Sequence, residues 1–434
     1  MPYIAKGIGG KLAQTIQHKS AEIESKLRGN WPMIEVYLQV GDPYSQLLLE
    51  YLAHHFADDI SSSRNDVNKL NITIRWIVDK EQDMFPEPVM LQKYARQDAH
   101  YLADKFGLKP PIELPLTASH QRTLSFYLET ITKRPYTTQD NMEVLLKALH
   151  HFTLNPTLIP DLGNKLAYAK RSCDYNAMNL INRGHYNSAM LYFAGDWYWG
   201  LDRLSYLSAR LGISDRQTQS TELKTDERAY ATRTSLQVDN AGSSPIILYW
   251  SARSPYSYLA LMRLINIGRK YKRRIEIKPV LPMVMRGVHV PKRKKMYIFR
   301  DTLRESQKHK IPYGFVADPL GTAVENCYAL LDYARSQGRY IEFLVSFSKA
   351  VNAQGIHADN ESGMYQIVKT AGLDWQIAKQ HLHNNRWRIE VDANLKEMYS
   401  LGVWGVPSIQ FENIVVWGQD RLDRIEEAII NDPR

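Results

Sequence analysis

The sequence predicts a mixed α/β protein built from two consecutive domains of the same type. The chain has 434 residues, a length that favours two or three domains over one. An apolar strand-like segment followed by a proline-led helical segment occurs twice, and further motifs recur in the same order in both halves.

The repeated pattern begins with a strand and the start of a helix. Ile34–Leu38 alternates as a strand does, and the apolar run Ile246–Trp250 is also typical of one. Asp42–Ser45 follows the first segment and Ser254–Ser257 follows the second, at an offset of 212 residues. Both tetrapeptides predict a helix start, because Asp and Ser are frequent N-caps and proline is favoured at the first helical position.

Motifs further along the chain keep the same order in the two halves. Tyr94–Asp98 matches Tyr297–Asp301 at an offset of 203 residues. Trp199–Leu204 matches Trp417–Leu422 at an offset of 218 residues. We interpret the halves as a tandem duplication. The alternative is a coincidental likeness between two α/β domains.

The duplication sets the predicted domain boundaries. The stretch 218–244 is polar and typical of a linker, and apolar residues near helical spacing predict a short helix at the N-terminus. Each domain should run strand, helix, strand, helical insertion, hairpin and last helix. The predicted parts are a helical arm (1–30), a first domain (31–217), the linker (218–244), and a second domain (245–434) with a helical insertion at about 297–400 and hairpin strands Ser408–Phe411 and Ile414–Trp417.

The net charge of +9 falls entirely on the second half of the chain. Residues 1–243 contain 27 Lys and Arg against 27 Asp and Glu, whereas residues 244–434 contain 28 against 19. Much of the excess lies in Arg269–Lys278 and Lys292–Lys295. A basic patch suits nucleic acid or a small anionic ligand, and a solvated helix end is the commonest explanation. We do not expect a nucleic-acid partner.

Composition favours a cytoplasmic protein. Cys173 and Cys327 are the two cysteines and form no Cys-x-x-Cys pair, which favours buried thiols in a reducing compartment. No apolar run approaches the roughly 18 residues of a membrane span, and residues 1–30 lack the apolar core of a secretory signal. The adjacent histidines of His54-His55 and His150-His151 would point different ways on a helix, and His381-x-His383 lacks carboxylate or cysteine neighbours, so we expect neither a membrane nor a metal.

Four motifs of the second half together resemble one protein family. They are Ser254–Tyr258, Lys294-x-x-Tyr297-x-x-x-Asp301, Gly405–Ser408 and Trp417–Leu422. In this order they are similar to the 2-hydroxychromene-2-carboxylate isomerase family, which is related to kappa-class glutathione transferases and DsbA-type oxidoreductases. The resemblance implies a thioredoxin-type domain with an inserted helical domain. Through the repeat, it implies two tandem DsbA-type domains.

The resemblance also implies a glutathione-dependent isomerase with Ser254 as its catalytic residue. In this fold type, the residue that opens the first helix meets free amides and the positive helix end, where an anion is favoured. A cysteine there becomes a thiolate, whereas Ser254 would donate a hydrogen bond to the thiolate of bound glutathione. On local sequence alone, Ser254 is an ordinary N-cap.

The resemblance implies several glutathione-binding residues. Gly405–Pro407 resembles a loop that holds a cis-proline opposite the helix start, with the Val406 main chain free to pair with the extended ligand. Asp420 resembles the residue that binds the γ-glutamyl amino group, and it is also a good N-cap for the last helix. Gln419 would contact the same group. Lys294 would meet a carboxylate, although a solvated lysine is the alternative. The implied set is Val406, Pro407, Gln419, Asp420 and Lys294.

The substrate implied by the resemblance is a small conjugated carbonyl or aromatic compound. A kappa-like transferase and a non-catalytic glutathione-binding protein are the alternatives. The family has an acidic residue three positions before the serine, whereas this chain has Ser251, and this departure leaves the substrate's identity open.

The first half departs further from the family. Asp42 stands at the position of Ser254, and Ala189 stands at that of Pro407. A carboxylate at the helix start would repel a thiolate. We therefore interpret this half as a degenerate copy that packs against the second half as an intramolecular pseudo-dimer. A distinct site that uses Asp42 is the alternative.

Overall fold

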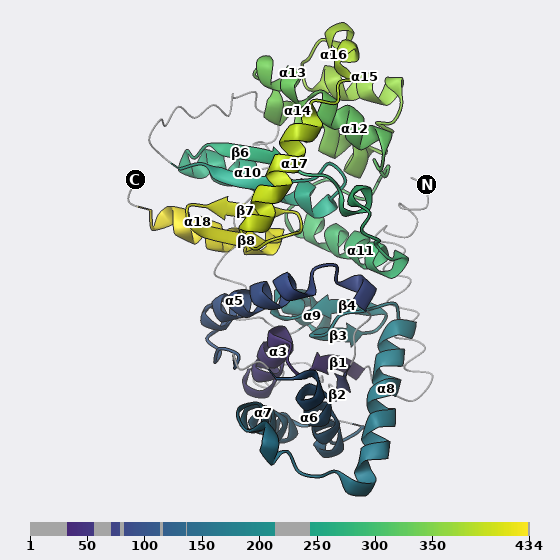
Figure 1. The fold of residues 1–434 in the computed structure, drawn as a ribbon, viewed down its shortest axis with the longest axis vertical. Helices are drawn as coiled ribbons and strands as arrows, with labels where there is room; N and C mark the ends of the chain where they lie inside the picture. The colour runs from purple at the N-terminus through teal and green to yellow at the C-terminus, as the bar shows by residue number, and fades with distance from the viewer. Residues whose placement is uncertain are drawn as a thin grey trace. The chain divides into compact units, whose positions relative to one another are not determined.

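The computed structural model describes residues 33–55, 71–78, 82–112, 116–135, 137–212 and 244–432, which belong to two compact units (Figure 1). The predicted helical arm and all of the predicted linker except Ser244 lie outside the described residues. The domain boundaries therefore stay predictions. Within the described ranges, no helix combines the length and the apolar character needed to cross a membrane.

The N-terminal unit is built on a four-stranded sheet. Its strands are β1 (Met33–Gln39), β2 (Asn71–Ile77), β3 (Met190–Phe193) and β4 (Asp196–Trp199), in the spatial order β2-β1-β3-β4. β1 runs parallel to β2 and antiparallel to β3, and β3 and β4 form a hairpin. Ile34, Val36 and Leu38 alternate along β1 and join the buried core, as their spacing predicted.

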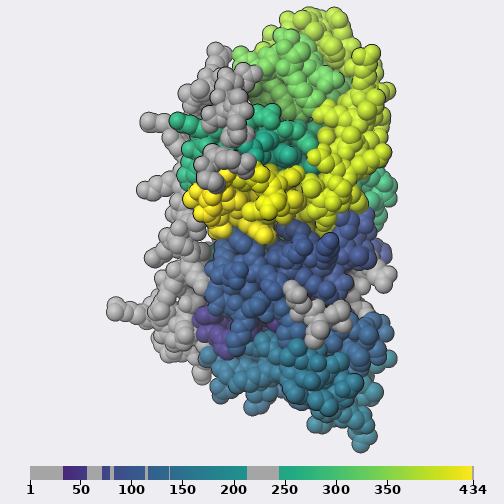
Figure 2. All heavy atoms as spheres, turned by 60° about the vertical axis from the view of Figure 1, so that its left-hand side comes forward, coloured from purple at the N-terminus to yellow at the C-terminus, as the bar shows by residue number. Residues whose placement is uncertain are grey.

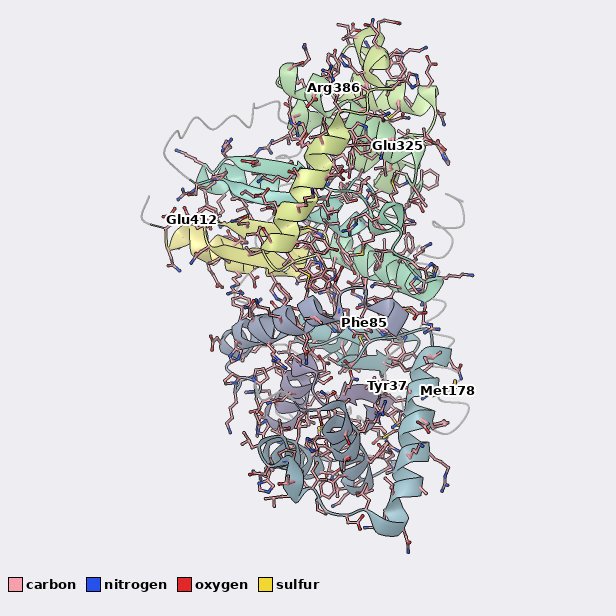
Figure 3. The ribbon with its side chains drawn as sticks, in the orientation of Figure 1. Tyr37, Phe85, Met178, Glu325, Arg386 and Glu412 are labelled. Atoms are coloured by element: carbon pink, nitrogen blue, oxygen red, sulfur yellow. The ribbon has the colours of Figure 1, made fainter. Side chains whose placement is uncertain are left out.

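Helices pack around this sheet. α3 packs against α5 and α7, and both α6 and α8 lie against β2. Tyr37 on β1 is fully buried, whereas Met178 on α8 is exposed (Figure 3). The helices are α3 (Pro43–His54), α5 (Pro88–Phe106), α6 (Ala118–Ile131), α7 (Gln139–Leu154), α8 (Leu166–Asn182) and α9 (Leu204–Leu211), with short 3₁₀ turns η1 (Gln82–Met84), η2 (Pro156–Leu158), η3 (Gly163–Lys165) and η4 (Leu201–Arg203).

The C-terminal unit contains a second four-stranded sheet. Its strands are β5 (Ile246–Trp250), β6 (Ile275–Pro279), β7 (Ser408–Phe411) and β8 (Ile414–Trp417), in the order β6-β5-β7-β8. The predicted hairpin strands are confirmed at both ends. α10 (Pro255–Tyr271) and α18 (Leu422–Ile430) pack on this sheet, and α17 (Trp387–Ser400) packs on β6.

A helical insertion separates β6 from the hairpin. It begins at Lys292 rather than at Tyr297, because the basic run forms the first turn of α11. Gly338 and Gly372 have positive φ values after α13 and α15, where a left-handed residue ends a helix. Figure 2 shows the green and yellow surfaces of this unit. The inserted helices before α17 are α11 (Lys292–Lys308), α12 (Thr322–Ala329), α13 (Leu331–Ser336), α14 (Tyr340–Lys349), the π-helical η8 (Ala350–Gln354), α15 (Glu361–Thr370) and α16 (Trp375–His381), preceded by the 3₁₀ turn η7 (Met283–Arg286).

The two sheets share strand order, strand directions and register. Tyr37 of β1 lies opposite Met190 of β3, and Tyr249 of β5 lies opposite Ser408 of β7. The paired positions keep the sequence offsets of 212 and 218 residues that relate the halves. The topology is therefore the same in both units, while tandem duplication itself stays a prediction.

Two asparagines make equivalent hydrogen bonds in the two units. Asn176 on α8 donates its side-chain amide to the Trp76 carbonyl, and Asn394 on α17 donates to the Pro279 carbonyl, each at 3.0 Å. Both amides are buried, so each satisfies a carbonyl near the end of a strand that water cannot reach.

Replacing Asn394 by alanine should destabilise the C-terminal unit. Without the amide, the buried Pro279 carbonyl loses this donor, at a cost of about 1–3 kcal/mol in the free energy of unfolding. Denaturant unfolding followed by tryptophan fluorescence measures the loss. The exposed Asn385→Ala change is the control and should stay within about 0.5 kcal/mol of the parent. Equal stability of the two variants would contradict this role of Asn394.

Candidate functional site

The candidate site begins at the N-terminus of α10. Ser254 has the extended backbone of an N-cap, with φ −80° and ψ 116°, and its hydroxyl accepts a hydrogen bond from the Ser257 N–H at 3.2 Å. Pro255 follows at the first helical position, where its missing N–H leaves no bond unmade. The helix start predicted from the sequence is confirmed, and Ser254 is half-buried at the end that carries the positive helix dipole.

The Val406–Pro407 loop lies directly opposite this helix start. The Val406–Pro407 peptide bond is cis, as the resemblance implied. The Ser254 hydroxyl lies 3.5 Å from the Val406 carbonyl oxygen, which is a long hydrogen bond. The structure therefore brings together three of the predicted site residues from positions about 150 apart in the sequence.

Close packing of two tryptophans shapes the same loop. Trp404 and Trp417 have ring centroids 4.5 Å apart. A Cβ at Gly405 would approach the Trp417 indole nitrogen to 2.6 Å, which is too close for any side chain. Gly405 therefore lets the chain pass Trp417 immediately before it reaches Val406.

Helix α11 is joined by hydrogen bonds both to the start of α10 and to the 3₁₀ turn η9 (Gln419–Arg421). The Tyr256 hydroxyl donates to Asp301 of α11 at 2.7 Å. The Gln419 amide donates to Glu305 of α11 at 2.8 Å, and the Arg263 guanidinium of α10 donates to the Gln419 carbonyl oxygen at 2.7 Å. No sequence pattern indicated Arg263 or Glu305, because their partners are more than one hundred residues away.

Gln419 and Asp420 are adjacent in η9, but their settings differ from the prediction. Gln419 is fully buried, and its amide donates to both Glu305 and Asp420, so both amide hydrogens are used inside the protein. Asp420 is half-buried and is not the N-cap of the last helix. Arg421 occupies that position, because the 3₁₀ turn intervenes before α18 begins at Leu422.

Lys294 lies in the first turn of α11, within a run of four cations. Burial disfavours its charged form and lowers the pKa of the ammonium group to about 8. Cations at the positive end of a helix are unfavourable, so this turn is an electrostatic environment that attracts an anion. α11 packs against α10, the helix that Ser254 begins.

Arg253, immediately before Ser254, forms a bidentate ion pair that the sequence did not indicate. Its Nε and Nη2 atoms lie 2.7 Å from the two carboxylate oxygens of Asp318. Burial alone would raise the pKa of Asp318, but the hydrogen bonds and charge of Arg253, with the Leu320 N–H, lower it below its ordinary value. The cation beside the serine is thus neutralised locally and fixed in direction.

Both cysteine thiols lie outside this site. Cys173 and Cys327 are buried and free. Burial raises the pKa of each thiol above its ordinary value, and Cys327 has no exposed surface at all. Since the thiolate is the reactive form, neither cysteine is suited to disulfide exchange.

The N-terminal unit differs at the equivalent position. Asp42 lies at the start of α3 but does not cap it, because its carboxylate accepts hydrogen bonds from the Ser45 and Ser188 hydroxyls at 2.6 Å each rather than from a backbone N–H. Ala189 is fully buried with φ +55°, where the other unit has cis-Pro407.

Titration of Lys294 should show a midpoint near pH 8. An ordinary lysine has a pKa of about 10.4, and burial of Lys294 makes its proton easier to lose. NMR titration of isotope-labelled lysine side chains measures the midpoint, and the signal missing from the Lys294→Arg variant assigns it. A midpoint above pH 10 would show that the ammonium group is well solvated.

Residues 245–430 match the family model of the DSBA-like thioredoxin domain. A 2-hydroxychromene-2-carboxylate isomerase from Sphingobium xenophagum is 25% identical over 194 residues, which are 43% of this chain and 98% of that protein. The isomerase of the same name from Pseudomonas putida is 25% identical over 189 residues, covering 42% of this chain and 92% of that protein.

A solved structure of a 2-hydroxychromene-2-carboxylate isomerase is also similar. It is 25% identical, has a TM-score of 0.37, and covers 42% of this chain and 93% of its own. The C-terminal half of this chain, with its β6-β5-β7-β8 sheet and cis-Pro407 loop, therefore has a DsbA-like thioredoxin fold and is related to proteins named 2-hydroxychromene-2-carboxylate isomerase.

Proposed function

We propose that the C-terminal unit binds glutathione and uses the thiolate of glutathione to isomerise a small conjugated carbonyl compound. The observation that carries the proposal is the placement of the Ser254 hydroxyl at the start of α10, opposite the Val406 carbonyl. The two related isomerases support the reaction class.

The start of α10 suits a thiolate better than a neutral thiol. The first backbone N–H groups of the helix have no partner within it, and the helix dipole adds positive potential. The Ser254 hydroxyl is free to turn from the long bond to Val406 and donate to a sulfur anion. Arg253 stays paired with Asp318, so Ser254 and the helix end supply the main stabilisation.

The remaining predicted residues suit the ends of a glutathione molecule. Val406 presents main-chain groups beside cis-Pro407, where an extended peptide could pair as it does at a strand edge. The Asp420 carboxylate would accept hydrogen bonds from the γ-glutamyl ammonium group. Because the Gln419 amide hydrogens are already used, Gln419 would orient Asp420 rather than bind the ligand itself. Lys294 would attract a ligand carboxylate while it keeps its proton, below about pH 8.

The chemistry needs no redox partner. The glutathione sulfur adds to the carbon–carbon double bond conjugated with the carbonyl, forming a C–S bond and moving the π electrons to an enolate oxygen. Rotation follows about the bond that has become single. The enolate then reforms the double bond and expels the thiolate, so glutathione is regenerated. Groups that stabilise the thiolate and the enolate lower the barrier.

The same site could hold glutathione for conjugation instead, and the products distinguish the two reactions. An isomerase returns free glutathione, whereas a transferase leaves a stable thioether. A pseudo-dimer of the two halves stays part of the proposal, because a tandem copy would supply the second half at high effective concentration.

Replacing Ser254 by alanine should lower turnover of 2-hydroxychromene-2-carboxylate by about 10²–10³-fold, the usual effect of losing one donor to a developing anion. Absorbance assays of the full chain with and without glutathione measure the rate. The exposed Ser362→Ala change is the matched control and should leave the rate unchanged.

Three results would count against the proposal. Turnover that does not need glutathione would show that the glutathione thiolate is not the nucleophile. Equal rates for the parent and Ser254→Ala would show that the Ser254 hydroxyl does not contribute to catalysis. Glutathione binding without turnover of any conjugated carbonyl compound would make the unit a binding module.

A further inference from the structure

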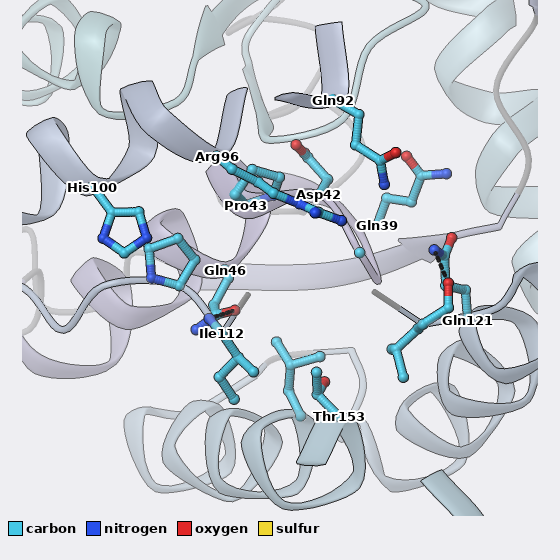
Figure 4. Close-up of a pocket in the computed structure, with 14 residues that line it drawn as sticks. Gln39, Asp42, Pro43, Gln46, Gln92, Arg96, His100, Ile112, Gln121 and Thr153 are labelled. Atoms are coloured by element: carbon cyan, nitrogen blue, oxygen red, sulfur yellow. Dashed lines mark hydrogen bonds between the residues drawn. The ribbon is translucent and has the colours of Figure 1, made fainter. Parts of the chain in front are cut away.

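The N-terminal unit contains a polar pocket beside the start of α3. It is lined by residues from the end of β1, from α3, and from α5, α6 and α7 (Figure 4). Every lining residue belongs to this unit. The proposed glutathione chemistry does not use this pocket.

Two opposite charges line the pocket without pairing with each other. Asp42 enters from the start of α3, where the Ser45 and Ser188 hydroxyls both donate to one of its oxygens, Oδ2. Arg96 enters from α5, and among the described residues it has neither a hydrogen bond nor an ion pair. An arginine that is partly removed from water, and that has no anionic partner among the described residues, is suited to bind an anionic group of a ligand.

Amide side chains surround these charges. Gln92 is also without a hydrogen bond among the described residues. Gln39 and Gln121 donate their amide nitrogens to the Val78 and Leu116 carbonyls, and no described donor reaches their side-chain oxygens. The pocket therefore offers spare acceptors and donors as well as both charges.

The charge pair is specific to this unit. By the offsets that relate the two halves, Ser254 corresponds to Asp42 and Phe299 corresponds to Arg96. Both neutral positions of the C-terminal unit are thus charged in the N-terminal unit, and with opposite signs. The Ser188 hydroxyl, which donates a hydrogen bond to Asp42, belongs to the residue that corresponds to Val406 of the other unit.

We propose that this pocket binds a small zwitterion with an α-amino acid head group. The ligand's carboxylate would accept bidentate hydrogen bonds from Arg96, and its ammonium group would donate to Asp42. A zwitterion satisfies both charges at once without adding net charge to the pocket. A simple anion or cation would satisfy one and leave the other. The spare amides of Gln92, Gln39 and Gln121 would bind a polar ligand side chain.

The test is isothermal titration of the full chain with the standard free L-amino acids, followed by the N-acetyl and carboxamide derivatives of the tightest binder. The free amino acid should bind at least about tenfold more tightly than either derivative, because each derivative loses one charge contact. The same amino acid should bind the Ser254→Ala variant unchanged, which locates the binding away from the proposed glutathione site.

Two variants assign the contacts. Asp42→Asn should weaken the free amino acid but not its N-acetyl derivative, and Arg96→Gln should weaken the free amino acid but not its carboxamide. The matched controls are Asp104→Asn and Lys93→Gln, which change exposed charges on α5 outside the pocket and should bind as the parent does.

Binding of no amino acid at millimolar concentration would overturn the proposal. So would derivatives that bind as tightly as the free amino acid, a result that holds even if either pocket variant fails to fold. Equal losses in Arg96→Gln and Lys93→Gln would also overturn it.

Discussion

The candidate site depends on one buried side chain, Gln419. Its amide donates to Glu305 on α11, and its carbonyl oxygen accepts from Arg263 on α10, so it holds two helices and the η9 turn at fixed positions. A buried amide without partners is strongly destabilising, which makes this arrangement specific as well as stable. Together with the hydrogen bond from Tyr256 to Asp301, these contacts join α10, α11 and η9, the three elements that carry the candidate site residues.

The two units use one backbone plan with different polar chemistry. In the N-terminal unit, Glu35 on β1 pairs with Arg75 and Arg183. In the C-terminal unit, Lys278 on β6 pairs with Glu397 on α17 at 2.7 Å. Lys278 also lies 3.7 Å from Glu276 on its own strand, so the C-terminal unit places acidic partners on both the helix and the sheet, with the same strand order and register. Such differences indicate that the fold tolerates new charges wherever each gains a partner.

Sequence patterns correctly predicted those strands, helix starts and turns that depend on neighbouring residues. Alternation identified β1, and the Ser254-Pro255 pair identified the start of α10. Turn residues identified the β7–β8 hairpin. α11 begins at Lys292, before the predicted start near Tyr297, although four adjacent cations are a poor helix start on intrinsic grounds. Tertiary packing overrides that preference.

Hydrogen bonds between residues that are far apart in the chain could not be predicted from the sequence. Nothing near Gln419 indicated that Glu305 and Arg263 would use its hydrogen-bonding capacity. Asp420 was predicted to cap the last helix because Asp is a common N-cap, but a 3₁₀ turn precedes that helix and Arg421 occupies the N-cap position. The bond between Arg253 and Asp318 likewise joins residues from separate segments. Each of these depends on how distant elements meet rather than on a local pattern.

The most direct measurement is the pKa of the glutathione thiol when it is bound to the full chain, followed by thiolate absorbance in the ultraviolet as pH is raised. The account predicts a value at least about one unit below the ordinary thiol value of roughly 8.5, and a return toward that value in Ser254→Ala. A bound thiol that titrates as it does free in solution, in the parent and the variant alike, would contradict stabilisation of the thiolate by Ser254 and the start of α10.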